Sequence, residues 1–294
     1  MKAKHLRKNL RTYLLAVLST LLIASLALAG CVSAPADDKT APTPEVLPPA
    51  AELRVLKVGA SPAPHAEILA SVKDALAAEG IDLQIIEYTD YVIPNTAVQD
   101  GEIDANYFQH QPYLTDFNKE NGTDIVSVAS IHFEPLAIYA GTAASLEDIA
   151  DGAKIAVPND TTNEARALQL LAAQGLITLP ADADLTITPR DIVSNPKNIE
   201  FVEVEAAAVP RQLAEVSVAV INGNYALDAQ ISSDKILASE DAASLAAQTY
   251  ANIVAVKAGN ESNPDVQALV RALTSIQTLD FINNTYGGVV VPVF

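Results

Sequence analysis

The feature that most constrains the fold of this chain is a regular alternation of strand-like and helix-like segments. Residues 53–59 and 81–88 have the composition of strands, and the segment 65–79 between them carries apolar residues at helical spacing before it stops at Gly80. A strand, a helix and a strand in this order predict two parallel strands of one sheet. Since the alternation extends over about 240 residues, we predict an α/β protein with two lobes.

The same signals give the remaining elements. Further strands are expected over 103–108, 124–133, 136–140, 154–157, 198–204, 216–221 and 249–257, and further helices near 95–101, from 109–114, and over 145–150, 166–174, 206–213 and 265–279. Glu134-Pro135 is interpreted as a crossing between the lobes. The predicted domains are lobe 1 over 52–135 and 240–294, and lobe 2 over 136–239.

One corner of the predicted lobe 2 has the features of an anion site. A strand ends at Pro158, and Thr161-Thr162-Asn163-Glu164 reads as a capping box that opens a helix. Side chains of a helix lean towards its N-terminus, so the guanidinium of Arg166 can lie near the free amides of the first turn. A forked guanidinium suits a carboxylate. We therefore predict that this corner holds the α-carboxylate of a small ligand; the alternative is a surface ion pair of Arg166.

Unusual polar and aromatic side chains follow the predicted strands. In open α/β sheets, ligands bind beyond the carboxyl ends of the parallel strands. The loops at these ends contain Tyr91, Asn95, Phe108, His110, Asn159, Asn163, Asn222 and Asn224.

Composition excludes several classes of function. The formal net charge of −18 disfavours a nucleic-acid partner. Cys31 is the single cysteine, so no intramolecular disulfide can form, and no His/Cys cluster indicates a metal site. We find no nucleophile elbow, phosphate-binding loop or metal-ligand helix, so the sequence does not predict an enzyme or a cofactor.

The N-terminus reads as an export signal. Residues 1–11 are basic, residues 14–29 are apolar, and Leu28-Ala29-Gly30-Cys31 resembles a bacterial lipobox. That resemblance implies a signal peptide over 1–30 and lipidation of Cys31, with the Pro- and Ala-rich segment up to residue 51 as a tether. The expected location is the cell envelope, anchored to a membrane on its extracytoplasmic side. The alternatives are a plain signal peptide or an anchor helix.

Five motifs together resemble one family. They are DYVIPN at 90–95, IDANYFQH at 103–110, VPNDTTN at 157–163, NPKN at 195–198 and AVINGNYA at 219–226. In this order they look like the methionine-transport substrate-binding lipoproteins, the MetQ/NlpA family. The resemblance implies a type II periplasmic-binding fold, with two lobes joined by hinge strands that close on an amino acid in the cleft between them. It also implies delivery of the ligand to an ABC permease and its ATPase.

The resemblance also suggests roles for individual residues. Arg166 would bind the ligand carboxylate with help from Asn163, and Asn222 would hydrogen-bond the amino and carboxylate groups. Tyr91, Phe108, His110 and Tyr113 would form a wall around an apolar side chain of the ligand. A thioether suits such a wall, because sulfur makes favourable contacts with aromatic edges. Asn224 completes the predicted ligand-binding set.

Plainer roles and other functions remain open at this point. Tyr91 and Tyr113 could pack on a lobe surface, Phe108 could be core, His110 could cap the helix that it starts, and Asn222 and Asn224 could form a turn. The ligand could be another amino acid or a short peptide. A surface lipoprotein without a transport role is a further alternative.

Overall fold

The computed structural model of the protein describes residues 53–243 and 245–294. The predicted signal peptide, the lipidated Cys31 and the tether lie outside these residues. Within the described part of the chain, no helix combines the length and the apolar character needed to cross a membrane.

The first of two sheets is mixed. Its strands lie in the order β11-β4-β10-β3-β1-β2. Their bounds are β1 (Arg54–Ala60), β2 (Ile81–Glu87), β3 (Ala105–His110), β4 (Ile125–Phe133), β10 (Asn252–Lys257) and β11 (Val291–Pro292). β1 pairs in parallel with both β2 and β3, whereas β10 is antiparallel to both β3 and β4. The predicted parallel pair at the start of the fold is therefore confirmed.

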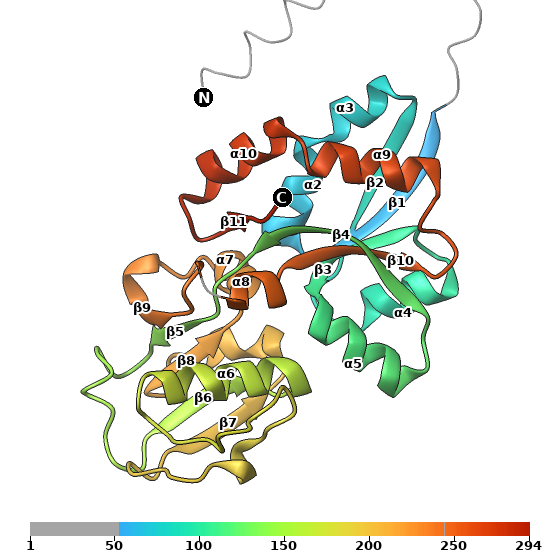
Figure 1. The fold of residues 1–294 in the computed structure, drawn as a ribbon. Helices are drawn as coiled ribbons and strands as arrows, with labels where there is room; N and C mark the ends of the chain where they lie inside the picture. Colours follow the sequence, from blue (N-terminus) through green and yellow to red (C-terminus); the bar gives the residue numbers. More distant parts are fainter. Residues whose placement is uncertain (1–52, 244) are drawn as a thin grey trace, which may run out of the picture. The chain divides into compact units, whose positions relative to one another are not determined.

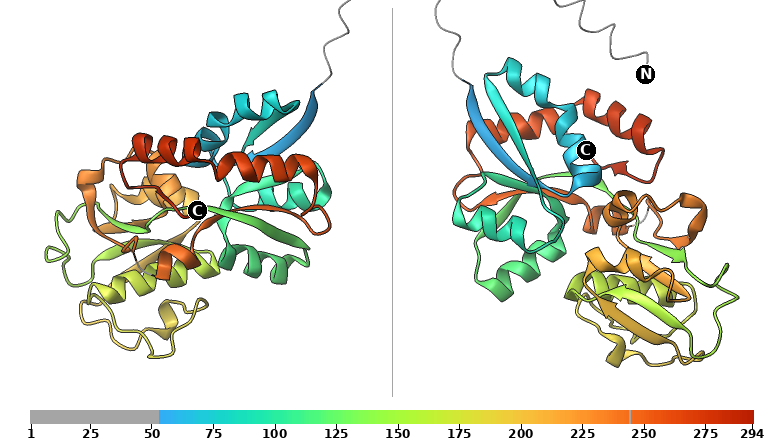
Figure 2. Two further views of the ribbon diagram at one scale, coloured as in Figure 1. Left: turned by 45° about the horizontal axis from the view of Figure 1, so that its top comes forward. Right: turned by 180° about the vertical axis from the view of Figure 1, so that it is seen from behind.

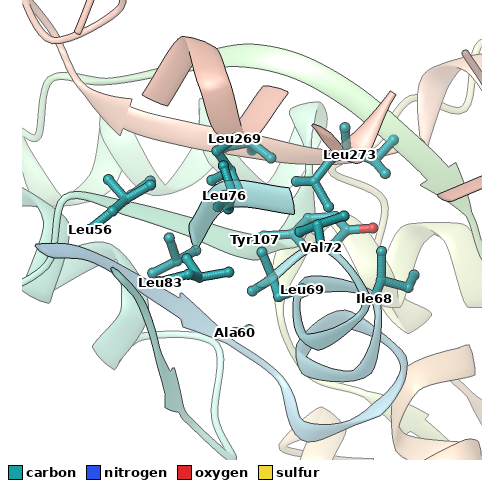
Figure 3. Close-up of a cluster of buried hydrophobic side chains, with 14 of the residues drawn as sticks. Leu56, Ala60, Ile68, Leu69, Val72, Leu76, Leu83, Tyr107, Leu269 and Leu273 are labelled. Carbon is teal, nitrogen blue, oxygen red and sulfur yellow. The ribbon is translucent and has the colours of Figure 1, made fainter. Parts of the chain in front are cut away.

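Helices cover both faces of this sheet (Figure 1). One face carries α2 (Glu67–Ser71), α3 (Lys73–Ala78), α9 (Pro264–Leu273) and α10 (Ile276–Tyr286), and the other carries α4 (Ile93–Asp100) and α5 (Gln111–Asn121). Both faces of the sheet are apolar, because successive side chains of a strand point to opposite faces. In β10, Val254 and Val256 belong to the core under the first group of helices, and Ile253 and Ala255 belong to the core under α4 and α5. Figure 3 shows Leu76 and Leu269 in the first of these cores.

The second sheet has the strand order β7-β6-β8-β5-β9. Its strands are β5 (Ala137–Ala140), β6 (Lys154–Pro158), β7 (Glu200–Val204), β8 (Val218–Ile221) and β9 (Ile236–Ser239). β6 is parallel to β7 and β8, and α6 (Thr161–Ala173) packs its apolar face against β6 and β8. The short helices η3 (Ala206–Gln212) and α7 (Gly223–Asp228) cover the opposite face, as can be followed in Figure 2.

The chain passes twice between the sheets. The first crossing, residues 134–136, joins β4 to β5, and the second follows β9 and leads through α8 (Leu245–Thr249) to β10. The crossings lie side by side, because Ala137 pairs with Ser239 and the amide of Glu240 donates to the carbonyl of Leu136 at 3.0 Å. We call the elements built on the first sheet the first lobe and those built on the second sheet the second lobe.

Several predicted helices differ from the structure. Residues 145–150 form only bends and turns, although the hydroxyl of Ser145 accepts from the amide of Asp148, a contact typical of a helix start. The helix expected over 265–279 is broken into α9 and α10, since the hydroxyl of Ser275 caps a new helix by accepting from the amide of Thr278. The helix expected over 206–213 is the 3-10 helix η3, which ends at Gln212 and contains Pro210.

Candidate functional site

Helix starts and strand ends from both lobes enclose a cavity of about 340 Å³ of empty space. All predicted ligand-binding residues line it, namely Tyr91, Phe108, His110, Tyr113, Asn163, Arg166, Asn222 and Asn224. The structure therefore brings together side chains that are far apart in the sequence.

The start of α6 differs in detail from the predicted capping box. Asp160, not Thr161, is the capping residue: its backbone is extended, and its Oδ1 accepts from the amide of Asn163 at 3.1 Å. The same Oδ1 accepts from Nδ2 of Asn163 at 2.9 Å. Asp160 therefore fixes the side chain of Asn163 as well as the helix start.

Asn163 connects the lobes at the cavity. Its Oδ1 accepts from Nδ2 of Asn222 at 2.9 Å and contacts Nε2 of His110 at 3.2 Å. The other ring nitrogen of His110 accepts from the amide of Tyr113, so the ring proton lies on Nε2 and is donated to Asn163. Oδ1 of Asn222 is buried and accepts no hydrogen bond from the described residues. Asn222 thus offers the cavity a free acceptor.

Arg166 is only 4% exposed, so the alternative of a surface ion pair is wrong. Its Nε donates to Oε1 of Glu240 at 2.7 Å, and its Nη2 donates to Oε2 of the same carboxylate at 2.5 Å. Nη2 also donates to the carbonyl of Glu134 at 3.0 Å. The ring centroid of Tyr250 lies 4.2 Å from Cζ of Arg166. Among the described residues, Nη1 has no hydrogen-bond partner. No local pattern in the sequence indicated Glu240 as the counter-charge.

Aromatic rings form one wall of the cavity. The centroid of Tyr91 lies 5.7 Å from that of Phe108 and 5.6 Å from that of Tyr113. The hydroxyl of Tyr91 donates to Oδ1 of Asn224 at 2.6 Å, and the hydroxyl of Tyr113 donates to the carbonyl of Tyr91 at 2.9 Å. His110 caps α5, as its plainer interpretation expected, and it lines the cavity too.

The electrostatics of the wall favour neutral side chains. Burial, assisted by the charge of Arg166, lowers the pKa of His110 to about 3, so its imidazole is uncharged at neutral pH. Burial also raises the pKa of Tyr91 and of Tyr113, which keeps both phenols protonated. Among the described residues that line the cavity, the guanidinium of Arg166 is thus the one cation.

Sequence reasoning missed four lining residues: Gln109, Glu134, Gly223 and Asn252. Gln109 and Gly223 lie inside two of the recognised motifs, whereas Glu134 and Asn252 lie outside them. A Cβ on Gly223 would stand 2.7 Å from Oε2 of Glu134, so the two lobes approach too closely there for a side chain.

Three buried groups beside the cavity could in principle hold a metal ion. Suitable ligand atoms of His65, His132 and Glu134 lie within 4.8 Å of one another. Hydrogen bonds already use them: Nε2 of His132 bonds to Oε1 of Glu134 at 2.7 Å, and Nε2 of His65 bonds to Asn252 at 3.0 Å. Burial lowers the pKa of His65 to about 4 and that of His132 to about 3. We therefore interpret these residues as a hydrogen-bonded network.

A larger groove lies elsewhere, between Tyr139 of the second lobe and Tyr286 of the first, with about 1,050 Å³ of empty space. It contains none of the predicted ligand-binding residues, and none of the described residues that line it is charged. The smaller cavity is thus the candidate site, because there an unpaired acceptor, a guanidinium and an aromatic wall meet.

Comparisons with known proteins agree with this architecture. The family model for NlpA lipoproteins matches residues 56–294. The methionine-binding lipoprotein MetQ of Bacillus subtilis is 39% identical over 241 residues, which are 80% of this chain and 87% of the relative. A nutrient-binding protein of Burkholderia cenocepacia, solved with bound methionine, is 41% identical with a TM-score of 0.77; the match covers 81% of this chain and 100% of the other.

A further solved structure is a periplasmic substrate-binding protein of an ABC transporter from Coxiella burnetii. It is 39% identical with a TM-score of 0.76, and the match covers 81% of this chain and 100% of the other. These likenesses confirm the predicted type II periplasmic-binding fold, and the relatives are binding proteins, not enzymes. The chain is a substrate-binding lipoprotein and belongs to the NlpA lipoprotein family.

Proposed function

We propose that the protein binds methionine as a zwitterion in this cavity. The observation that carries the proposal is that two polar groups of the lining have no hydrogen-bond partner among the described residues. They are Nη1 of Arg166, a charged donor, and Oδ1 of Asn222, a buried acceptor. A free amino acid has a carboxylate and an ammonium on one carbon, which complement these two groups. A buried acceptor without a partner is unfavourable by about 1–3 kcal/mol, and a ligand ammonium removes that cost.

The opposite wall suits the side chain of methionine. Rings of Tyr91, Phe108 and Tyr113 lie within 5.6–6.1 Å of one another. Sulfur makes favourable contacts with ring edges at about 5 Å, and an unbranched thioether adapts to an irregular apolar space. The methionine named for two of the relatives supports this assignment.

Binding is proposed to proceed by closure of the lobes. Hydrogen bonds across the cleft already join Tyr91 to Asn224, His110 to Asn163, and Tyr225 to the carbonyl of Thr89 at 3.3 Å. A ligand that contacts Arg166 in one lobe and the aromatic wall in the other stabilises only the closed arrangement, in which both contacts exist.

Transport is the proposed purpose of this binding. A lipid on Cys31 would hold the protein at the extracytoplasmic side of a membrane, and an ABC permease with its ATPase would take the ligand from the closed form. The family membership and the ABC-transporter relative support this role.

Calorimetric titration tests the ligand. We expect L-methionine to bind, and D-methionine, glutamine and methionine-containing dipeptides are titrated beside it to define the ligand class. Asn222→Ala removes the unpaired acceptor and is expected to weaken methionine binding roughly 10- to 100-fold, the size of a hydrogen bond to a charged group.

The matched control is Asn283→Ala, which removes an exposed asparagine on α10 and should leave the affinity unchanged. Tight binding of another ligand and no heat with methionine would show that the assigned ligand is wrong. An unchanged affinity of Asn222→Ala would show that the assigned site is wrong.

A further inference from the structure

The guanidinium of Arg166 has two sides with different partners. Nε and Nη2 face Glu240: Oε1 of Glu240 accepts from Nε at 2.7 Å, and Oε2 accepts from Nη2 at 2.5 Å. Arg166 lines the cavity, whereas Glu240 does not. Glu240 therefore lies behind the guanidinium as seen from the cavity, and it does not occupy the place of a ligand carboxylate.

Glu240 is itself fixed to both chain crossings. Its amide donates to the carbonyl of Leu136 at 3.0 Å, and its Oε2 accepts from the amide of Leu136 at 2.9 Å. Arg166 adds a hydrogen bond to the carbonyl of Glu134 in the first crossing at 3.0 Å. One ion pair thus links α6 of the second lobe to both segments that join the lobes.

Aromatic rings limit the remaining freedom of the guanidinium. Cζ of Arg166 lies 4.2 Å from the ring centroid of Tyr250 and 5.7 Å from that of Phe133. Tyr250 lies near the end of the second crossing, between α8 and β10, and Phe133 directly precedes the first crossing. Because Glu240 binds Nε and Nη2 and the rings of Tyr250 and Phe133 lie nearby, the guanidinium is held in one orientation. In this orientation Nη1 has no hydrogen-bond partner among the described residues.

We propose that Glu240 is the positioning residue for recognition of the ligand carboxylate. Glu240 holds the Nε and Nη2 edge of Arg166, so that Nη1 is presented to the cavity. Through this ion pair, the bound carboxylate is connected to the chain crossings. This inference rests on the proposed function. A pre-oriented donor loses little conformational entropy on binding, which is the reason that positioning raises affinity.

The test compares two ligands on three proteins. Methionine and methioninol share the ammonium and the side chain, but methioninol carries a hydroxymethyl group in place of the carboxylate. Methionine is titrated by calorimetry, and methioninol is measured by its competition with methionine. The proteins are wild type, Glu240→Gln and the control Glu215→Gln, which changes an exposed acid of the second lobe. Circular dichroism selects a temperature at which all three are folded.

Glu240→Gln is expected to weaken methionine binding about tenfold or more, and to change methioninol binding less than twofold, because methioninol has no carboxylate to position. Glu240→Asp keeps the charge but shortens the side chain, so it should lie between wild type and Glu240→Gln. Glu215→Gln should behave as wild type.

Two results would overturn the inference alone: methionine affinity that Glu240→Gln leaves unchanged, or an equal loss for both ligands, which indicates a general effect on the fold. Wild-type protein that binds no methionine would instead overturn the proposed function and the inference with it. The two failures are therefore distinguishable.

Discussion

The ion pair between Arg166 and Glu240 gives a sharp prediction about stability. The two side chains are 4% and 11% exposed, so solvent screens their charges little. Arg166→Met leaves the carboxylate of Glu240 buried without its partner. Breaking a buried pair in this way costs about 3–5 kcal/mol. For a folded body of this size, 1 kcal/mol shifts Tm by about 2–4 °C, so Tm should fall on the order of 10 °C.

The double variant separates the pair from its surroundings. Glu240→Gln removes the second charge and keeps an acceptor for the amide of Leu136, so Arg166→Met combined with Glu240→Gln should be more stable than Arg166→Met alone. The interaction energy, from urea unfolding of wild type, the two single variants and the double variant, should reach about 2 kcal/mol.

An exposed ion pair provides the control. Arg271 and Glu79 lie 2.9 Å apart, but their side chains are 63% and 50% exposed. Arg271→Met should therefore cost less than about 1 kcal/mol. Additive effects at Arg166 and Glu240, within about 0.5 kcal/mol, would refute the reasoning that their charges depend on each other.

Two further predictions concern the pH and the start of α6. The pKa of His132 is lowered by burial to about 3, so the folded state binds fewer protons than the unfolded state below about pH 6.5, and stability falls as the pH decreases towards 3. His132→Gln should reduce this decline by about 1.4 kcal/mol per pH unit between pH 6 and 4, as measured by urea unfolding; a parallel profile would contradict the assignment. Asp160→Ala should cost about 1 kcal/mol and Thr161→Ala less than about 0.5, because Asp160 provides the cap; the reverse order would favour the capping box.

Much of the fold could be predicted because its strands are buried on both faces. Such strands appear as continuous apolar runs, as in Val218–Ile221, and the helices between them carry one apolar face. Where a local hydrogen bond decided the outcome, the pattern was insufficient. The hydroxyl of Ser275 starts a new helix inside an apolar periodicity that continues through it, so one expected helix became two.

The candidate site was predicted through its motifs, and residues outside them were missed. Glu240 stands 74 positions after Arg166, and its partner is fixed only when the chain crossings meet. Asn252 is the first residue of β10, and the four residues that follow it are apolar. No local signal distinguishes such residues, because their roles come from tertiary contacts. The ligand-binding roles and the lobe boundaries remain predictions, and the titration of Asn222→Ala tests the first of these at one residue.

The hydrogen bonds of the aromatic wall have a consequence for selectivity. The hydroxyls of Tyr91 and Tyr113 donate hydrogen bonds to protein oxygens, and both ring nitrogens of His110 form hydrogen bonds within the protein. A guest side chain that reaches this wall therefore meets hydrocarbon and π-faces. Glutamine resembles methionine in length, yet its terminal carbonyl would lose water and find no free donor in this wall, a loss of about 1–3 kcal/mol. We therefore predict that ligands with polar side chains bind more weakly, because the polar groups of the wall already bond within the protein.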